Sequence, residues 1–357
     1  MRWYAAASAL VLVLSRALGA CSSSDAASPD SAAVSASPAT TSPTLGAGDF
    51  GSANSPTAGG DAGGVSRPAS TPAKLATDLT LEAPFDGTYK AYDLGEIPGV
   101  PSGHRYGGAM LAPNDKDSLL FGVDSEAADG SIWRVKLTRG WDGNIIGFSG
   151  TASRVMSAPN VDANLLLLPD GSMLVPGWPT RELHVIAKGG TAPAHTYTLP
   201  QQLSGLGFVP GNFPAGIAGR LKMIDWSACN FHTVDLAVGA SGLYEPGNVH
   251  DEGVHLPNGC GGFAYIPNGS PLFPKGGLML AEWSTKTATF EIDANANPIP
   301  STRREFLSNL AGSWSAYFDT VSGNYLFLTW GNSPDRVIVV QGFVPPPPTP
   351  PPPSTPR

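Results

Sequence analysis

Charge is scarce in this chain, and positive charge most of all. Asp, Glu, Lys and Arg make up 14% of the residues, against about 25% in an ordinary globular domain. The 21 Lys and Arg residues are outnumbered by 29 Asp and Glu residues, which leaves a net charge of -8 and no basic stripe. Because binding to a phosphate backbone needs clustered Lys and Arg, the composition argues against a nucleic acid as partner.

Several enzyme motifs are also missing. The sequence has no Gly-x-Ser-x-Gly motif and no glycine-rich phosphate loop leading into a helix. Neither Cys229 nor Cys260 stands in a known cysteine-histidine catalytic pattern, although His232 is near Cys229. The segment His104-Arg105-Tyr106 precedes an apolar strand, and we interpret it as a hydrogen-bonding loop. Nucleophilic and phosphoryl-transfer chemistry therefore have no support in the sequence.

The first apolar run is short. Residues 5–14 are apolar and follow the single positive charge of Arg2, as in an export signal, and the run is shorter than the roughly 20 residues that span a bilayer. Leu18-Gly19-Ala20-Cys21 resembles the lipobox of bacterial lipoproteins, although Arg16 departs from the usual pattern. The resemblance implies a signal peptide at 1–20, lipid on Cys21 and a place in the cell envelope, at the outer membrane or cell surface. An ordinary secretory signal is the alternative.

Two cysteines remain after Cys21. In an oxidising, exported setting Cys229 and Cys260 could form a disulfide, but the sequence does not show whether they lie close together.

Both ends of the chain have low complexity. Residues 21–76 are almost all Ser, Ala, Thr, Pro, Gly and Asp, which cannot bury enough apolar surface to offset the entropy of ordering. We expect a disordered tether there. Residues 345–357 are a Pro/Thr/Ser run, typical of polyproline II.

Glycine (43) and proline (35) are abundant, and they punctuate an internal repeat. Between the tails, a unit of apolar strand, Pro/Asn/Asp/Gly turn and apolar strand recurs about every 50 residues, a period typical of propellers. The first strands of the five copies begin at Gly108, Asn164, Gly207, Gly262 and Ser315. A third strand follows each copy, at 132–137, 183–186, 231–236, 288–292 and 337–340.

This repeat predicts an all-β fold, a β-propeller over residues 77–344 with five visible blades. A sixth, degenerate blade would have to lie in 78–87 or 193–203. The lone strand 88–94 is expected to complete the last blade and close the ring. Residues 165–168 are apolar throughout, as in a strand buried on both faces. A β-sandwich or a two-domain β protein is the alternative fold.

One stretch carries a family resemblance. Gly262-Phe263-Ala264-Tyr265-Ile266-Pro267 and the segment from Asp335 to Phe343 look like secreted propellers of the NHL and SMP-30/gluconolactonase-like kind. The likeness is good over about a quarter of the chain, so it implies the fold more than an activity.

A tryptophan ends the second strand in four of the five repeats, at Trp178, Trp226, Trp283 and Trp330. Such rings could form a stacking face for sugars, with Asp225 and Glu282 as polar partners. Packing of each ring between neighbouring blades is the alternative interpretation.

The resemblance also implies a metal site. SMP-30-like lactonases bind a divalent metal such as calcium through carboxylate and Asn oxygens near the central channel, which points to Glu252, Asn160, Asp162 and Asn164. His250 and His255 add imidazole ligands close to Glu252. A polar surface loop is the alternative for the segment from His250 to His255.

Taken together, these features favour a surface-tethered propeller that binds an envelope protein or glycan rather than catalysing a reaction. The alternatives are a metal-dependent lactonase or hydrolase of the SMP-30 type and a passive structural envelope lipoprotein.

Overall fold

The computed structural model describes residues 73–353, apart from 227, 258, 284–285 and 333. The signal peptide, the lipidation of Cys21 and the tether as far as residue 72 lie outside the described residues. No helix among the described residues is long and apolar enough to cross a membrane.

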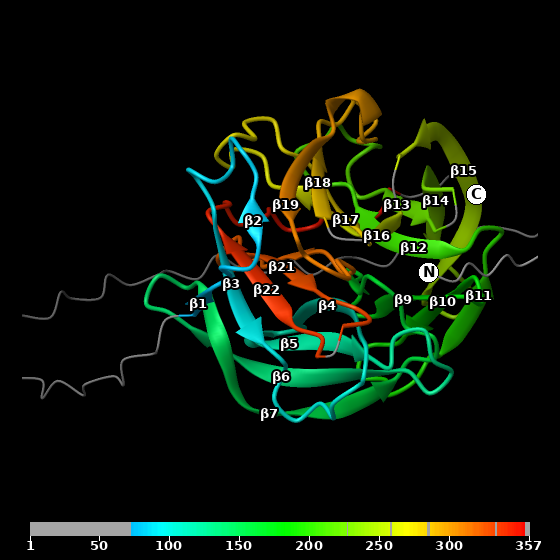
Figure 1. The fold of residues 1–357 in the computed structure, drawn as a ribbon. Coiled ribbons are helices and arrows are strands. Elements are labelled where there is room, and N and C mark those ends of the chain that lie inside the picture. Colours follow the sequence, from blue (N-terminus) through cyan, green and yellow to red (C-terminus); the bar gives the residue numbers. More distant parts are fainter. Residues whose placement is uncertain (1–72, 227, 258, 284–285, 333, 354–357) are drawn as a thin grey trace, which may run out of the picture. The chain divides into compact units, whose positions relative to one another are not determined.

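Five antiparallel sheets make up the described part of the chain (Figure 1). Blade 1 contains β4 (Tyr106–Ala112), β5 (Asp115–Val123), β6 (Ser131–Arg139) and β7 (Ile145–Ser157). Blade 2 contains β8 (Leu166–Leu167), β9 (Met173–Gly177), β10 (Glu182–Ile186) and β11 (His195–Thr198). Blade 3 contains β12 (Leu203–Phe208), β13 (Leu221–Asp225), β14 (Asn230–Val238) and β15 (Tyr244–His255).

The last two blades also take strands from the N-terminal side. Blade 4 contains β16 (Cys260–Ile266), β17 (Gly277–Glu282), β18 (Lys286–Phe290), β19 (Arg304–Ser308) and β2 (Thr80–Leu81). A short 3-10 helix, η1 (Pro300–Thr302), precedes β19. Blade 5 contains β20 (Tyr317–Phe318), β21 (Tyr325–Leu328), β22 (Val337–Gln341), β3 (Lys90–Gly95) and β1 (Lys74–Leu75).

The ring is closed as the sequence predicts. Strand β3 pairs antiparallel with β22, so a strand from before the first blade completes the last one, with Tyr92 opposite Val339. Next to this closure, the rings of Tyr89 and Phe306 each lie within 6.4 Å of the rings of Phe85 and Phe343, measured between centroids. Large aromatic side chains bury much apolar area, so the cluster stabilises the junction between blades 4 and 5.

The described residues form five blades, as the visible repeats predict, and the possible sixth blade is not present among them. Residues 80–81 form an extra edge strand on blade 4, and residues 195–198 form the outer strand of blade 2. Both segments contribute one short strand to an existing sheet, and neither contains the strand pair that a further blade would need.

The apolar strand at 165–168 differs from expectation. Leu165 and Leu168 are buried, but Leu167 is 38% exposed. The strand lines the cavity inside the ring, so one face of β8 meets open space rather than a second packed layer.

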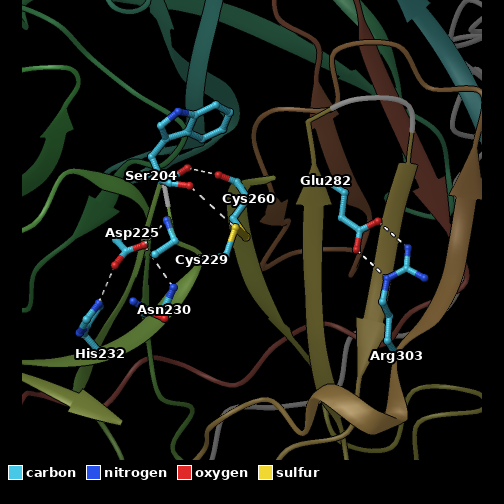
Figure 2. The surroundings of a disulfide bond; sticks show 10 residues. Ser204, Asp225, Cys229, Asn230, His232, Cys260, Glu282 and Arg303 are labelled. Carbon is cyan, nitrogen blue, oxygen red and sulfur yellow. Dashed lines mark hydrogen bonds and ion pairs between the residues drawn. A yellow bond between two sulfur atoms is a disulfide. The ribbon is translucent and has the colours of Figure 1, made fainter. Parts of the chain in front are cut away.

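Blades 3 and 4 are covalently joined. Cys229, which precedes β14, forms a disulfide with Cys260, the first residue of β16, with Cα atoms 5.8 Å apart (Figure 2). The pairing that the sequence left open is therefore present in the structure.

Candidate functional site

The inner strands of the blades all begin at the same end of the ring. Each second strand runs antiparallel to its inner strand, as β13 does to β12, so the second strands end where the inner strands begin. Residues just before an inner strand and just after a second strand therefore gather at one end. We call it the tryptophan end.

Five indole rings meet there. Trp226 lies 6.3 Å from Trp178, 6.2 Å from Trp283 and 5.4 Å from Trp314, measured between ring centroids. Trp330 completes the set at 6.0 Å from Trp283 and 5.7 Å from Trp314. The rings therefore contact one another across blades 2 to 5. Contacts of this kind agree both with a stacking face and with packing between neighbouring blades.

The five rings differ in their exposure to solvent, and some of their N–H groups have no hydrogen-bond partner among the described residues. Trp283 is 40% exposed, whereas Trp314 is 1% exposed. The buried indole N–H groups of Trp178, Trp314 and Trp330 have no hydrogen-bond partner among the described residues. Buried donors are almost always paired, so three unpaired donors in one cluster are an unusual feature of this end of the ring.

Blade 1 contributes polar groups instead of a tryptophan. The guanidinium of Arg105, just before β4, lies 4.2 Å from the centroid of the Trp330 ring. Glu126 follows β5, and its pKa is raised to about 7 by burial, against a smaller opposing effect of Arg105. An acid with a pKa near 7 can both donate and accept a proton at neutral pH.

Asp162 is the deepest acid at this end. It is fully buried, and neither carboxyl oxygen has a hydrogen-bond partner among the described residues. Burial raises its pKa well above the usual value, and the nearby Glu126 raises it further. The amide of Ala163 opposes this rise without forming a hydrogen bond of good geometry. Both acids therefore hold a proton more strongly than an ordinary carboxyl group does.

The proposed polar partners of the tryptophans are engaged elsewhere. Asp225 accepts hydrogen bonds from the amides of Ala228 and Asn230 and pairs with His232 at 3.1 Å. Glu282 receives two hydrogen bonds from Arg303, at 2.7 and 2.5 Å (Figure 2). Both carboxylates therefore hold the ends of strands in place.

The side chain of Asn164 links the inner strands of several blades by hydrogen bonds. Its Oδ1 accepts from the amides of Leu206 (3.1 Å) and Phe263 (3.3 Å), and its Nδ2 donates to the carbonyl of Ala316 at 3.0 Å. Gly108, Gly205 and Gly262 lie so close to it that a Cβ added to any of them would come within 3.1 Å of an atom of Asn164. Its side chain thus ties the inner strands of blades 3, 4 and 5 to the start of blade 2.

The remaining metal candidates lie apart. Glu252, His250 and His255 are on β15, the outer strand of blade 3, whereas Asn160 and Asp162 precede the inner strand β8. No group of three His, Cys, Asp or Glu side chains in the described part of the chain could hold a metal. With the amide of Asn164 committed to the backbone, the donor set implied by the lactonase resemblance does not fit a metal.

A large cavity lies at the opposite end of the ring from the tryptophans. It has a volume of about 810 Å³ and is lined by apolar residues of the inner strands, such as Met110, Leu206 and Phe263, and by Asn164. Pro346, Pro347 and Thr349 of the C-terminal tail also line it. A mostly apolar cavity of this size suits a small molecule, but the tail occupies part of its wall.

Trp314 and Glu126 were not predicted from the sequence, and the segment that contains Arg105 was interpreted only as a hydrogen-bonding loop. Trp314 stands just before the inner strand β20, and Arg105 just before β4, so their position relative to the repeat was the available signal. Glu126 had no comparable signal, because its burial depends on how the loop after β5 folds against Val161, whose carbonyl accepts from the Glu126 amide.

The closed ring of five four-stranded or five-stranded sheets defines the class of this chain as a five-bladed β-propeller. No protein-family model matches it, and no curated protein matches its sequence.

Similar solved structures include the PQQ-bound aldose sugar dehydrogenase of Streptomyces coelicolor, at 14% identity and a TM-score of 0.37 over 71% of this chain and 84% of that one. A gluconolactonase of Xanthomonas campestris has 11% identity and a TM-score of 0.40, over 77% of this chain and 99% of that one. An auxiliary nutrient binding protein of Bacteroides ovatus has 10% identity and a TM-score of 0.37, over 71% and 77%. These proteins include enzymes and a binding protein, and the similarity is too low to choose between them.

Proposed function

We propose that this propeller is a carbohydrate-binding module that holds its ligand at the tryptophan end. The observation that carries the proposal is the cluster of five indole rings with three unpaired N–H groups. The C–H faces of a sugar pack on aromatic rings, and its hydroxyl groups accept from indole N–H donors.

The polar groups of blade 1 complement this aromatic surface. Glu126 and Asp162, protonated or ionised, can donate to or accept from sugar hydroxyls, and the Arg105 guanidinium donates only. A site with rings on four sides and acids on the fifth matches a ligand that is apolar on its faces and polar at its edge.

The location is part of the same proposal. A lipid on Cys21 would attach the chain to an envelope membrane, and a coil of about 55 residues has a mean reach of about 40 Å. A binding module held at that distance could reach envelope glycans. Metabolic labelling with a lipid precursor, compared between the natural chain and Cys21→Ser, tests the anchor.

The binding test uses a panel of purified envelope glycans and oligosaccharides with the full chain. Trp283→Ala removes the most exposed ring of the cluster, and we expect roughly a threefold to tenfold loss of affinity. Trp141→Ala is the matched control, because Trp141 is 96% exposed and makes none of the ring contacts of the cluster. Equal losses in both variants, or no glycan bound by the natural chain, would refute the proposal.

A second candidate function is hydrolysis of the bound sugar or its lactone. The observation that favours it is Glu126, whose pKa of about 7 suits a general acid or base. Because the donors do not fit a metal, a water would be activated by the Glu126 carboxylate itself. Glu126→Gln keeps a side chain that can hydrogen-bond a sugar hydroxyl, so it should abolish turnover of a sugar lactone and weaken binding much less. If the chain neither binds a glycan nor turns over a lactone, the result would favour the third alternative, a passive structural lipoprotein of the envelope.

A further inference from the structure

A lysine is buried between blades 3 and 4, far from the tryptophan end along its strand. Lys222 of β13 is 1% exposed. Its Nζ donates to Oδ1 of Asn297 at 2.7 Å and to Oε1 of Glu252 at 3.0 Å. Asn297, 3% exposed, lies in the blade 4 segment between β18 and η1.

Glu252 bridges the other two side chains. Its second oxygen, Oε2, accepts from Nδ2 of Asn297 at 2.9 Å, while Thr233 donates its hydroxyl to Oε1. The carboxyl group therefore contacts both the amine and the amide nitrogen. A single acid placed in this way can take a proton from one nitrogen and give it to the other.

The surroundings favour a reactive amine. Burial lowers the pKa of Lys222 from its usual value, against the opposing effect of Glu252, while Arg220 lowers it and Asp293 raises it slightly. The Phe231 ring lies 5.8 Å from Nζ, and Tyr265 donates its hydroxyl to the carbonyl of Ala296 beside the amide. A neutral amine has the free electron pair that a nucleophile needs.

The amide carbon is within reach of that amine. A carbonyl bond is about 1.23 Å long, so Cγ of Asn297 lies within about 4 Å of Nζ. Reacting atoms about 3 to 3.5 Å apart are in a near-attack arrangement. A shift of a few tenths of an ångström by two side chains already in contact is sufficient.

We propose that Lys222 and Asn297 join through an intramolecular isopeptide bond, formed by the chain itself with Glu252 as the acid–base group. Glu252 first takes a proton from the Lys222 ammonium. The Nζ electron pair then attacks Cγ of Asn297, and the carbonyl electrons move onto Oδ1.

A second Nζ proton passes through Glu252 to Nδ2. The Cγ–Nδ2 bond breaks, its electrons leave with the nitrogen, and the carbonyl re-forms. The products are a secondary amide and ammonia, which leaves as ammonium with the proton that Lys222 first carried, so no oxidant or other reactant is needed.

Peptide mapping of the reduced, alkylated full chain tests the bond. Trypsin cannot cleave after an acylated lysine, so the expected product is residues 221–275 joined to residues 287–303, lighter than the two peptides by one ammonia. A natural chain that is folded, stored for days and still yields the dipeptide 221–222 and a free peptide 287–303 overturns the proposal.

Variants test the role of each group. Lys222→Met and Glu252→Gln should both yield the unlinked peptides, with far-ultraviolet circular dichroism confirming that each is folded. Glu305→Gln is the control, since Glu305 pairs with Lys286 in a comparable but more exposed ion pair, and its chain should stay linked. If E252Q does not fold, E252D should form the bond more slowly. If E252D and E252Q form the bond at the natural rate, Glu252 has no role as the acid–base group of the reaction.

Discussion

The guanidinium of Arg105 lies 4.2 Å from the centroid of the Trp330 ring, at the boundary between blades 1 and 5. This contact places a positive charge beside the cluster of indoles and close enough to Glu126 to lower the pKa of that acid. Arg105 is therefore the residue through which the aromatic and acidic parts of the tryptophan end are connected.

Replacing Arg105 should weaken the binding of acidic sugars more than that of neutral ones. A cation over a ring contributes about 0.5 to 1 kcal/mol at an exposed site, and loss of an ionic hydrogen bond adds to it. We expect Arg105→Ala to reduce affinity for an acidic oligosaccharide about tenfold, measured by calorimetry at low salt. Arg304→Ala, an exposed arginine on β19, should have no effect, and a uniform loss for all sugars would contradict the assignment.

Glu126 should make the folded chain less stable as the pH rises. Burial raises its pKa to about 7 in the folded state, from an ordinary value of 4.5. Its contribution to folding stability is therefore complete below about pH 4.5 and is lost as the pH rises through about 7. Allowing for partial exposure, the loss is about 2 kcal/mol. Urea unfolding at pH 5 and pH 8 should show a smaller decrease for Glu126→Gln than for the natural chain. Equal decreases would show that Glu126 titrates normally.

The features that the sequence predicted correctly depend on neighbours in the chain. A Pro-Asn-Asp or Pro-Asp-Gly turn between two apolar strands specifies its own hairpin, and repetition of these hairpins indicates a propeller. Closure by residues 88–94 was expected only by analogy, but β3 does pair with β22.

The candidate site was harder to predict because carboxylates look alike in a sequence. Asp162 and Glu252 were both considered metal ligands. Their different surroundings depend on how distant segments meet: Glu252 contacts Lys222 only because β14 pairs with both β13 and β15. The sequence around Asn164 does not indicate that its side-chain amide forms hydrogen bonds with the backbone of three other blades.

Asn164 should be essential to the stability of the ring. Asn164→Ala would leave the amides of Leu206 and Phe263 and the carbonyl of Ala316 without their partner. Each unsatisfied buried group costs about 1 to 3 kcal/mol, so we expect a total loss of about 4 kcal/mol in chemical unfolding. Asn248→Ala, at an exposed position on β15, is the control. A loss below 1 kcal/mol would mean that water replaces the amide.

The C-terminal tail should limit access to the cavity at the other end of the ring. Pro346, Pro347 and Thr349 line this cavity of about 810 Å³, and Pro351 packs beside Gly219. A chain ending at Val344 should therefore bind a hydrophobic fluorescent dye more strongly than the natural chain. A chain ending at Pro353 keeps these contacts and should behave like the natural one. The same dye signal from all three would show that the tail does not cover the cavity.

The disulfide and the proposed Lys222–Asn297 bond should have overlapping effects on stability, because both connect blade 3 to blade 4. A disulfide that spans 31 residues stabilises a fold by about 3 to 4 kcal/mol in the chain-entropy model. If the isopeptide bond is present, the unfolded chain is already restricted, so Cys229→Ser/Cys260→Ser should lose less than this amount. In the E252Q background, where the second bond is not formed, the same double substitution should show the full loss. Thermal unfolding of the four chains measures the difference, and losses that are equal in the two backgrounds would mean that the two connections act independently.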